Sequence, residues 1–320
     1  MSAAPLRILV VGAGALGGYF GGRLLEAGAD VTFLVRPRRA AQLARDGLRV
    51  ASVHGDIALP APHVLADGIA APFDLVLLGC KAYDLDATLD DVAPAVGPAT
   101  AILPLLNGMR HLDAIAGRFG AACVLGGLCM ISATLDDDGT VRHLNDAHAL
   151  VFGERAGGGS PRVDAVAAAF AGARFEARAS RDIAQAMWEK WVFIAALAGA
   201  TCLLRGAVGD IVAAGASDAA LALLAECEAV AAANGAPVRP EVAARSRAML
   251  EAPGSMLVAS MLKDVERGGR TEAEHILGDL HARAGQVPVP LLRLALAHLR
   301  VHEARRGRSG GGEARAFAAD

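Results

Sequence analysis

Residues 6–17 read LRILVVGAGALG, and this stretch decides the fold. The segment Leu6–Val11 is a short apolar run, as expected for a strand that is buried on both faces. A GxGxxG loop, Gly12–Gly17, follows at once and opens a helical pattern that ends near Ala27. A strand, a glycine loop and a helix in this order predict a Rossmann-type dinucleotide-binding unit.

Each glycine of this loop has a role in such a unit. Gly12 permits the tight turn, Gly14 lets the backbone approach a pyrophosphate, and Gly17 lets the helix pack closely on the strand. Ala15 and Leu16 begin the helix, where backbone N–H groups and the helix dipole favour phosphate. The alternative is a glycine-rich packing turn that binds nothing.

The end of the second apolar strand, Val31–Val35, indicates which cofactor is bound. NAD sites usually have an Asp or Glu there, about 20 residues beyond the glycines. This chain reads FLVRPRR, with Arg36 at that position. A guanidinium binds a ribose 2′-phosphate bidentately, so we expect NADP(H). The alternative, a solvated loop start, fits Arg38 or Arg39 better than Arg36.

Strand-like and helix-like patterns continue to alternate through the first half of the chain. The further strand candidates are Leu75–Gly79, Ala101–Leu106 and Val124–Leu135. This alternation predicts an α/β fold with a Rossmann-type, doubly wound parallel sheet. The segment Thr140–Phe152 is expected to be a hairpin with its turn around Asn145.

The strand signals stop near Ser180. Before this point, a helix over residues 163–171 and a short strand in ARFEAR (173–178) complete the expected sheet. Beyond it, long helical patterns predict an all-helical C-terminal domain. We therefore expect an NADP-binding Rossmann domain over residues 1–180, a helical substrate domain over 181–305, and a flexible, glycine-rich tail over 306–320.

Length and composition support this division and exclude other classes. A chain of 320 residues exceeds what one core usually supports. A formal net charge of −3 offers no basic surface to nucleic acid or to an anionic membrane. The longest apolar run, Trp191–Leu204, is shorter than the ~20 residues of a membrane span and indicates a core helix. The N-terminal MSAAPLR lacks the features of a signal peptide, so we expect a cytoplasmic protein.

Cysteine and histidine give no sign of a metal centre. The five cysteines lie without metal-ligand spacing, and we expect reduced thiols and no metal. The nine histidines are scattered. His143 and His148 are placed to meet across a strand pair, but surface positions are the preferred interpretation.

Lys190 is the most informative residue of the second half. Met187, Ile194 and Ile183, at three, four and seven positions from it, put this lysine on an apolar helical stripe. A lysine there is costly unless it lines a cleft or has a partner, and it can then donate a proton. The alternative is a lysine whose stem packs while its ammonium reaches water.

A carboxylate partner is available in Arg270–Glu274 (RTEAE). Thr271 and Glu274 have capping-box spacing, so a helix is expected to begin at Thr271 with Glu272 in its first turn. The helix dipole favours an ionised Glu272 there, although an ordinary first-turn glutamate would look the same.

Two polar residues follow parallel strands of the first half. Asn107 follows Ala101–Leu106 and Lys81 follows LVLLGC, at the sheet edge where ligands bind in such folds. A turn-forming Asn-Gly and a solvated loop lysine are the alternatives.

Taken together, these segments resemble the ketopantoate reductase (2-dehydropantoate 2-reductase) family. The matching stretches, in the family's order, are VVGAGALGGYFGGRL, LGCKAYD, PLLNGM, WEKW and SMLKDVERGGRTEAEHI. By this resemblance Lys190 is the catalytic lysine and Glu272 the catalytic glutamate. Asn107 and Lys81 lie beside nicotinamide and substrate, and Ser260 binds the substrate carboxylate. The implied reaction is hydride transfer from NADPH to a branched 2-oxo acid, which favours catalysis for Lys190.

The chain departs from the family pattern at four positions. Ile194, Ala198, Val208 and Leu257 stand where relatives often have asparagines that contact the substrate. Ketopantoate reduction in pantothenate and coenzyme A biosynthesis is therefore one hypothesis, and reduction of a more apolar 2-oxo acid by a paralogue is another. A non-catalytic NADP(H) sensor is the third. A homodimer is compatible with the apolar helical domain, but the sequence does not determine the oligomeric state.

Overall fold

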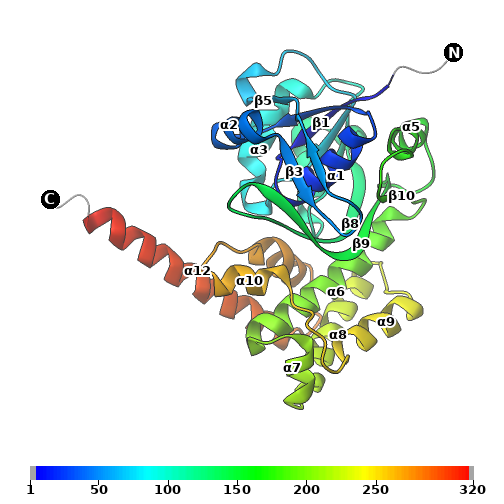
Figure 1. Ribbon diagram of the computed structural model, residues 1–320. Coiled ribbons are helices and arrows are strands. Elements are labelled where there is room, and N and C mark those ends of the chain that lie inside the picture. The colour runs from blue at the N-terminus through cyan, green and yellow to red at the C-terminus, as the bar shows by residue number, and fades with distance from the viewer. Residues whose placement is uncertain (1–4, 317–320) are drawn as a thin grey trace. The chain divides into compact units, whose positions relative to one another are not determined.

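The computed structural model describes residues 5–316, with side chains as far as residue 308. The chain divides into two compact units, Met1–Met187 and Trp188–Asp320. Figure 1 shows the strands in the blue-to-green part of the chain and helices alone in its later, yellow-to-red part. The division falls within helix α6 (Ile183–Leu204), so this helix contributes residues to both units.

The first unit is built on a five-stranded parallel sheet. Its strand order is β5-β2-β1-β6-β7, and every neighbouring pair is parallel. The strands are β1 (Arg7–Val11), β2 (Asp30–Leu34), β5 (His63–Val64), β6 (Leu75–Leu78) and β7 (Ala101–Pro104). The helices beside them are α1 (Ala15–Glu26), α2 (Pro37–Asp46), α3 (Leu85–Val92) and α4 (Arg110–Phe119). The predicted doubly wound α/β fold is confirmed.

Successive strand residues point into two different cores. In β1, Ile8 and Val10 join one hydrophobic cluster with Tyr19 and Phe20 of α1. Leu9 and Val11 join another that includes residues of α3 and α4. Since side chains alternate across a strand, a sheet covered on both faces needs continuous apolar strands such as β1 and β6.

A second sheet in this unit has the order β10-β9-β3-β4, with β8 pairing β9. Its strands are β3 (Leu48–Ala51), β4 (Ile57–Leu59), β8 (Leu125–Leu135), β9 (Thr140–Glu154) and β10 (Glu176–Ala179). Helix α5 (Pro161–Phe170) joins β9 to β10. The predicted strand in ARFEAR exists, but it pairs parallel with β9 and not with the first sheet.

The predicted hairpin turn at Asn145 is wrong. Strand β9 runs through this position, and β8 and β9 form the hairpin, with their turn at Asp136–Gly139. Gly139 has φ +82°, which suits this turn. Asn145 lies at an irregularity in the ladder, where its Oδ1 accepts a hydrogen bond from the backbone N–H of Ser132 (2.8 Å).

The described residues of the second unit form helices and connecting loops, without a strand. Its core contains Trp191 of α6 and large aliphatic side chains such as Leu223, Leu277 and Leu292, all at most 1% exposed. The remaining helices are α7 (Val208–Ala213), α8 (Ser217–Ala233), α9 (Pro240–Leu250), α10 (Ser260–Glu266), the π-helical turn η5 (Glu274–Gly278), α11 (Asp279–Ala282) and α12 (Pro290–Ala316).

Two helices bear on the sequence predictions. By length and composition α6 could cross a membrane, but 72% of its apolar window is buried inside the structure, which indicates a core helix. Helix α12 continues through the segment expected as a tail from Arg306, as far as Ala316. The ion pair between Arg306 and Glu303 (3.1 Å) favours this continuation. Residues 317–320 lie outside the described residues, and flexibility of the segment stays a prediction.

Candidate active site

The topology of the parallel sheet brings four predicted features to one edge. Sheet order places β2, β1, β6 and β7 side by side, all parallel. At their carboxyl ends follow Arg36, the Gly12–Gly17 loop, Lys81 and Asn107 in that order. Arg36 and Lys81 are exposed, and Asn107 is partly exposed. The edge is therefore an open row of polar and cationic groups around a glycine loop.

The backbone of the loop requires glycine at two positions. Gly12 has φ +88°, a left-handed conformation that other residues rarely adopt. A Cβ atom on Gly17 would lie 2.0 Å from the carbonyl oxygen of Gly12, so α1 could not approach the loop as closely. These are the turn and packing roles that the sequence predicts.

Gly14 has open space beside it, unlike Gly17, because a Cβ atom added to Gly14 would meet no atom within 4 Å. Gly14 is the N-cap of α1, and among the described residues no side chain caps this helix and no acidic residue lies in its first turn. Exposed N–H groups at a helix N-terminus suit a phosphate. The loop thus fits the pyrophosphate of a dinucleotide.

Arg36 is the N-cap of α2, and its side chain is 71% exposed. Its guanidinium forms an ion pair with Asp84 (3.1 Å), which precedes α3. An exposed ion pair contributes little to stability and can exchange for a stronger anion. Arg36 is thus accessible to a 2′-phosphate at the end of β2.

A solvated loop position was the alternative for Arg38 or Arg39, and of these Arg39 is instead part of this edge. Its Nε donates to the carbonyl of Ala13 in the glycine loop (3.0 Å), and Nη1 donates to Gly139 (3.0 Å). The Nη2 atom is buried without a hydrogen-bond partner among the described residues. Burial lowers the pKa of the guanidinium, with a smaller effect from Arg49. Sequence spacing gives no signal for these contacts, which join segments 26 and 100 residues apart.

Lys190 lies on α6 and is partly buried. Ile183 and Met187 on its stripe are buried (0% and 4% exposed), as the sequence predicts. The preceding residue, Glu189, is 5% exposed and accepts two hydrogen bonds from the Arg239 guanidinium, at 2.7 and 2.5 Å. A bidentate pair of this kind fixes the backbone from which Lys190 projects.

The predicted capping box at Thr271 is not formed. The backbone N–H and hydroxyl of Thr271 both donate to Glu303 of α12 (2.7 and 2.8 Å), and Glu274 pairs with Arg300 of α12 instead. The helix begins at Ala273, so Glu272 precedes its first turn. Thr271 and Glu274, the two residues of the predicted box, thus both form their hydrogen bonds with α12 and not with each other's backbone. The capping-box spacing therefore does not predict the local structure here.

Glu272 is partly exposed, and its carbonyl accepts hydrogen bonds from the N–H groups of His275 and Ile276 (3.1 and 3.0 Å). The π-helical turn η5 follows it directly. Turns of this type occur frequently at functional sites. Ser260 is the first residue of α10 and is exposed. Lys190, Glu272 and Ser260 thus all belong to the second unit.

The histidine prediction is wrong for His143, which is only 6% exposed. His54 and His148 stack at 3.7 Å between ring centroids, and His148 shares a 2.8 Å hydrogen bond with the hydroxyl of the buried Tyr19. Burial lowers the pKa of His148, with smaller effects from His54 and His143. His54, His143 and His148 thus form a cluster near the irregularity of β9. Tyr19 of α1 packs against this part of the strand and covers the cluster.

All five cysteines are free thiols, and four of them are buried. Burial raises the pKa of Cys202 to about 12. Among the described residues no group of three or more His, Cys, Asp or Glu side chains could hold a metal ion. The four buried thiols therefore act as packing residues.

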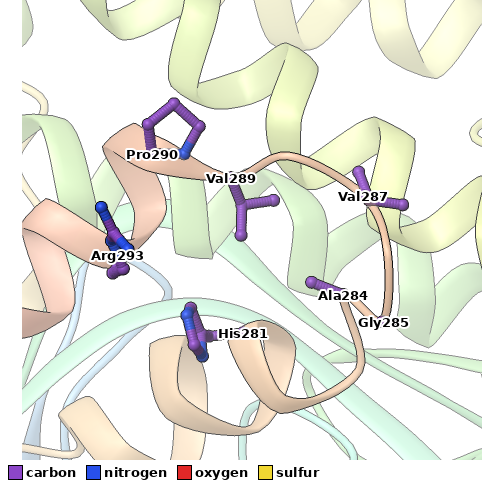
Figure 2. A pocket seen from close by; sticks show the side chains of 7 residues that line it. All are labelled: His281, Ala284, Gly285, Val287, Val289, Pro290 and Arg293. Carbon is purple, nitrogen blue, oxygen red and sulfur yellow. The ribbon is translucent and has the colours of Figure 1, made fainter.

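A cavity of about 320 Å³ lies between α11 and the start of α12 (Figure 2). Figure 2 shows His281 on α11 and Arg293 on α12, with Val287 and Val289 on the connecting loop. A further cavity, of about 420 Å³, lies beside Ser160 and Arg181 in the first unit. None of the predicted site residues lines either cavity, so neither defines the site.

The fold and the glycine-loop edge define a Rossmann protein with a helical C-terminal unit, the architecture of a nicotinamide-dependent oxidoreductase. Two family models match the chain: ketopantoate reductase PanE/ApbA at residues 8–157, and its C-terminal counterpart at residues 182–303. The chain belongs to the ketopantoate reductase family, whose members are NADP-dependent oxidoreductases. The predicted family and enzyme class are confirmed.

Similar proteins cover nearly the whole chain. An uncharacterized oxidoreductase, YkpB of Bacillus subtilis, is 38% identical, and the match spans 93% of this chain and 99% of that protein. A 2-dehydropantoate 2-reductase of Halobacterium salinarum is 30% identical over 90% of this chain and 96% of that protein. The crystal structure of 2-dehydropantoate 2-reductase from Geobacter metallireducens superposes with a TM-score of 0.84 at 32% identity, covering 92% of this chain and 99% of that one.

Proposed function

We propose that this chain reduces 2-dehydropantoate (ketopantoate) to pantoate with NADPH, a step of pantothenate and coenzyme A biosynthesis. The observation that carries the proposal is the row of Arg36, the glycine loop, Lys81 and Asn107 along one sheet edge, because ligands bind at this edge in such folds. The Halobacterium relative is named for this reaction.

The residues present fit NADP(H). The open space at Gly14 and the uncapped start of α1 suit a pyrophosphate. Arg36 is exposed at the end of β2, where a carboxylate would favour NAD instead. Arg39 adds a second guanidinium, whose buried Nη2 has no partner among the described residues. Two cations follow the end of β2, and the carboxylate that pairs with Arg36, that of Asp84, lies before α3 and is exposed enough to be displaced by a 2′-phosphate.

In the proposed mechanism NADPH, when bound, supplies a hydride for the carbonyl carbon of the 2-oxo acid. The ammonium of Lys190 donates the proton that the carbonyl oxygen needs, and Glu272 orients that ammonium and the substrate. Ser260 would bind the substrate carboxylate, while Asn107 and Lys81 would hold the cofactor and substrate at the sheet edge. A general acid of this kind contributes about 10²- to 10⁴-fold in rate.

A second candidate is a paralogous reductase that acts on a more apolar 2-oxo acid. It is favoured by Ile194 and Leu257, which are apolar and partly exposed at positions where the family resemblance implies asparagine. A non-catalytic NADP(H) sensor is less well supported, because binding alone needs no proton donor such as Lys190.

The test is kcat/KM for ketopantoate and for 2-oxoisovalerate, which lacks the hydroxyl, with NADPH at one pH. We expect ketopantoate to be reduced, with an advantage below ~10⁴-fold, since a site without dedicated polar partners discriminates weakly. A preference for 2-oxoisovalerate would favour the paralogue. Binding of NADPH without reduction of any 2-oxo acid would favour the sensor and refute the proposal.

We also propose that the protein acts in the cytoplasm as a homodimer. Leu294 and Val301 of α12 are 56% and 59% exposed and lie seven residues apart, on one helix face. Exposed apolar side chains on one face suit a partner surface. Light scattering of the purified protein measures the mass directly, and a monomeric mass of 32.6 kDa would contradict the dimer.

A further inference from the structure

Trp191, the residue after Lys190, joins α6 to the segment that follows Glu272. The side chain is fully buried (0% exposed), and its indole Nε1–H donates a 2.9 Å hydrogen bond to the backbone carbonyl of Ile276. Buried tryptophan N–H groups usually find a partner, but here the partner is a backbone group 85 residues away. One bond thus links the segments that carry the candidate acid and carboxylate.

The acceptor lies in an irregular part of the backbone. Ile276 belongs to the π-helical turn Glu274–Gly278, and its own N–H donates to the carbonyl of Glu272 (3.0 Å). Such a turn uses i→i+5 bonds and holds one residue more than an α-helical turn, so it changes the direction of Glu272 relative to α11. Because π turns are rare and less favourable than α turns, an external donor to this turn stabilises it.

The packing around the indole leaves little room for it to move. The ring of Trp191 lies 4.9 Å from that of Trp188, and the Arg283 guanidinium lies over both rings, 5.6 and 5.9 Å from their centroids. Trp188 is also buried (8% exposed) and lies on the same helix. The two tryptophans therefore have similar surroundings, and the bond to Ile276 distinguishes Trp191.

We propose that Trp191 is a positioning residue for Glu272: its N–H fixes the π turn, and the turn keeps the carboxylate of Glu272 in one orientation during the reaction. The proposal rests on the proposed function, in which Lys190 donates the proton and Glu272 orients the Lys190 ammonium. Trp191 itself touches no reacting atom in this mechanism.

The test compares Trp191→Phe with Trp188→Phe, which removes the same indole atoms from the neighbouring ring. Trp191→Phe should lower kcat by about 10- to 100-fold, since misplacement by about 1 Å costs up to that much. The KM for the oxo acid should change by less than about threefold, because in the proposed mechanism Ser260 binds the substrate carboxylate, whereas the orientation of Glu272 matters most for the proton transfer. Trp188→Phe should retain most of kcat.

Two readouts separate positioning from a general loss of packing. A nearby carboxylate raises the pKa of a lysine, so the alkaline limb of kcat should move to lower pH in Trp191→Phe and stay in place in Trp188→Phe. Amide hydrogen exchange over residues 275–280 should accelerate only in Trp191→Phe, because only that variant frees the turn. If Trp191→Phe does not fold, 3-benzothienylalanine at position 191 replaces the N–H by sulfur and keeps the ring shape.

The outcomes are distinct. Unchanged kcat, alkaline limb and amide exchange in an otherwise active Trp191 variant would overturn the inference. An unaltered protein that reduces no 2-oxo acid would overturn the proposed function instead, and amide exchange would then decide the role of Trp191 in the turn. Accelerated exchange together with a lowered kcat and a shifted limb supports the inference.

Discussion

Alanine substitutions at Gly14 and Gly17 test the cofactor loop, because the structure predicts opposite effects on stability. A Cβ atom at Gly17 would lie 2.0 Å from the carbonyl oxygen of Gly12, and real Cβ atoms essentially never come closer than 3.0 Å. The backbone must therefore move by about 1 Å. At Gly14 the same atom meets nothing within 4 Å, and φ −85° is open to alanine.

These distances set the size of the effects. Overpacking of this kind costs about 1–3 kcal/mol, which is about 2–10 °C in Tm for a unit of this size, so Gly17→Ala should lower Tm by that amount. Gly14→Ala should leave Tm unchanged or raise it slightly, since alanine restricts the unfolded chain. Its methyl group nevertheless occupies the space into which a pyrophosphate would come, so NADPH affinity should fall at least ~10-fold, or 1.4 kcal/mol.

The assay is NADPH titration followed by fluorescence, together with thermal unfolding without cofactor. Gly117→Ala is the matched control, because Gly117 lies within α4 and a Cβ atom there also meets nothing within 4 Å. It should keep the NADPH affinity and leave Tm unchanged or slightly raised, since alanine is also the better helix former. Normal NADPH affinity in Gly14→Ala would refute the pyrophosphate site, and a normal Tm in Gly17→Ala would refute the packing argument.

Four further predictions concern charge. Arg36→Ala should weaken NADPH binding by roughly 10- to 100-fold and barely affect NADH. Equal NADPH and NADH affinities of the unaltered protein would contradict this role of Arg36. Arg39→Ala should weaken the binding of both NADPH and NADH, because it also removes the hydrogen bond to the glycine loop. Lys190→Ala and Glu272→Ala should each lower kcat by up to about 10²- to 10⁴-fold, and the double variant by much less than their product, whereas multiplicative losses would show independent roles. Because burial lowers the pKa of His148 below its ordinary 6.5, the folded protein binds fewer protons than the unfolded chain; stability should fall as pH drops through about 6.5, and a similar Tm at pH 8 and pH 5.5 would contradict this.

The sequence predicted four strands of the first sheet, because buried parallel strands leave a strong local signal, but it missed the two-residue edge strand β5. It also counted Val124–Leu135 with the parallel strands, whereas β8 pairs antiparallel with β9. After the exposed Arg7, β1 is a continuous apolar and buried run, as is Leu75–Leu78, and both strands are covered on two faces. The second sheet was harder, since Leu48–Ala51 and Ile57–Leu59 are short and mix polar with apolar residues. Asn145 is a residue typical of turns, but the hairpin turn lies at Asp136–Gly139. Pairing of β9 with β8 keeps the chain extended through Asn145, and the local sequence does not show this pairing.

The candidate site likewise has features that local sequence predicts and features that depend on contacts between distant segments. The glycine roles are properties of six consecutive residues, and sequence suffices for them. The contacts of Arg39 with Ala13, and of Thr271 with Glu303, join segments that only the folded chain brings together. Capping-box spacing at Thr271 is a local signal, but it cannot show that a carboxylate 32 residues later competes for the same donors.

The four departures that the family resemblance implies are not equivalent in burial, and this limits how they can act in the proposed substrate site. Ala198 and Val208 are only 2% and 1% exposed. The N–H of Val208 donates to the carbonyl of Leu257 (3.0 Å), so the loop before α10 lies directly against the start of α7. An asparagine at either buried position would bring an amide that needs new partners, since an unpaired buried amide is costly. Those two residues are therefore packing residues in this chain. Ile194 and Leu257 stay partly exposed, so any difference in substrate choice through these positions depends on two apolar side chains. A site that offers such surfaces favours the alkyl part of an oxo acid and gains nothing from a hydroxyl unless backbone groups or water bind it.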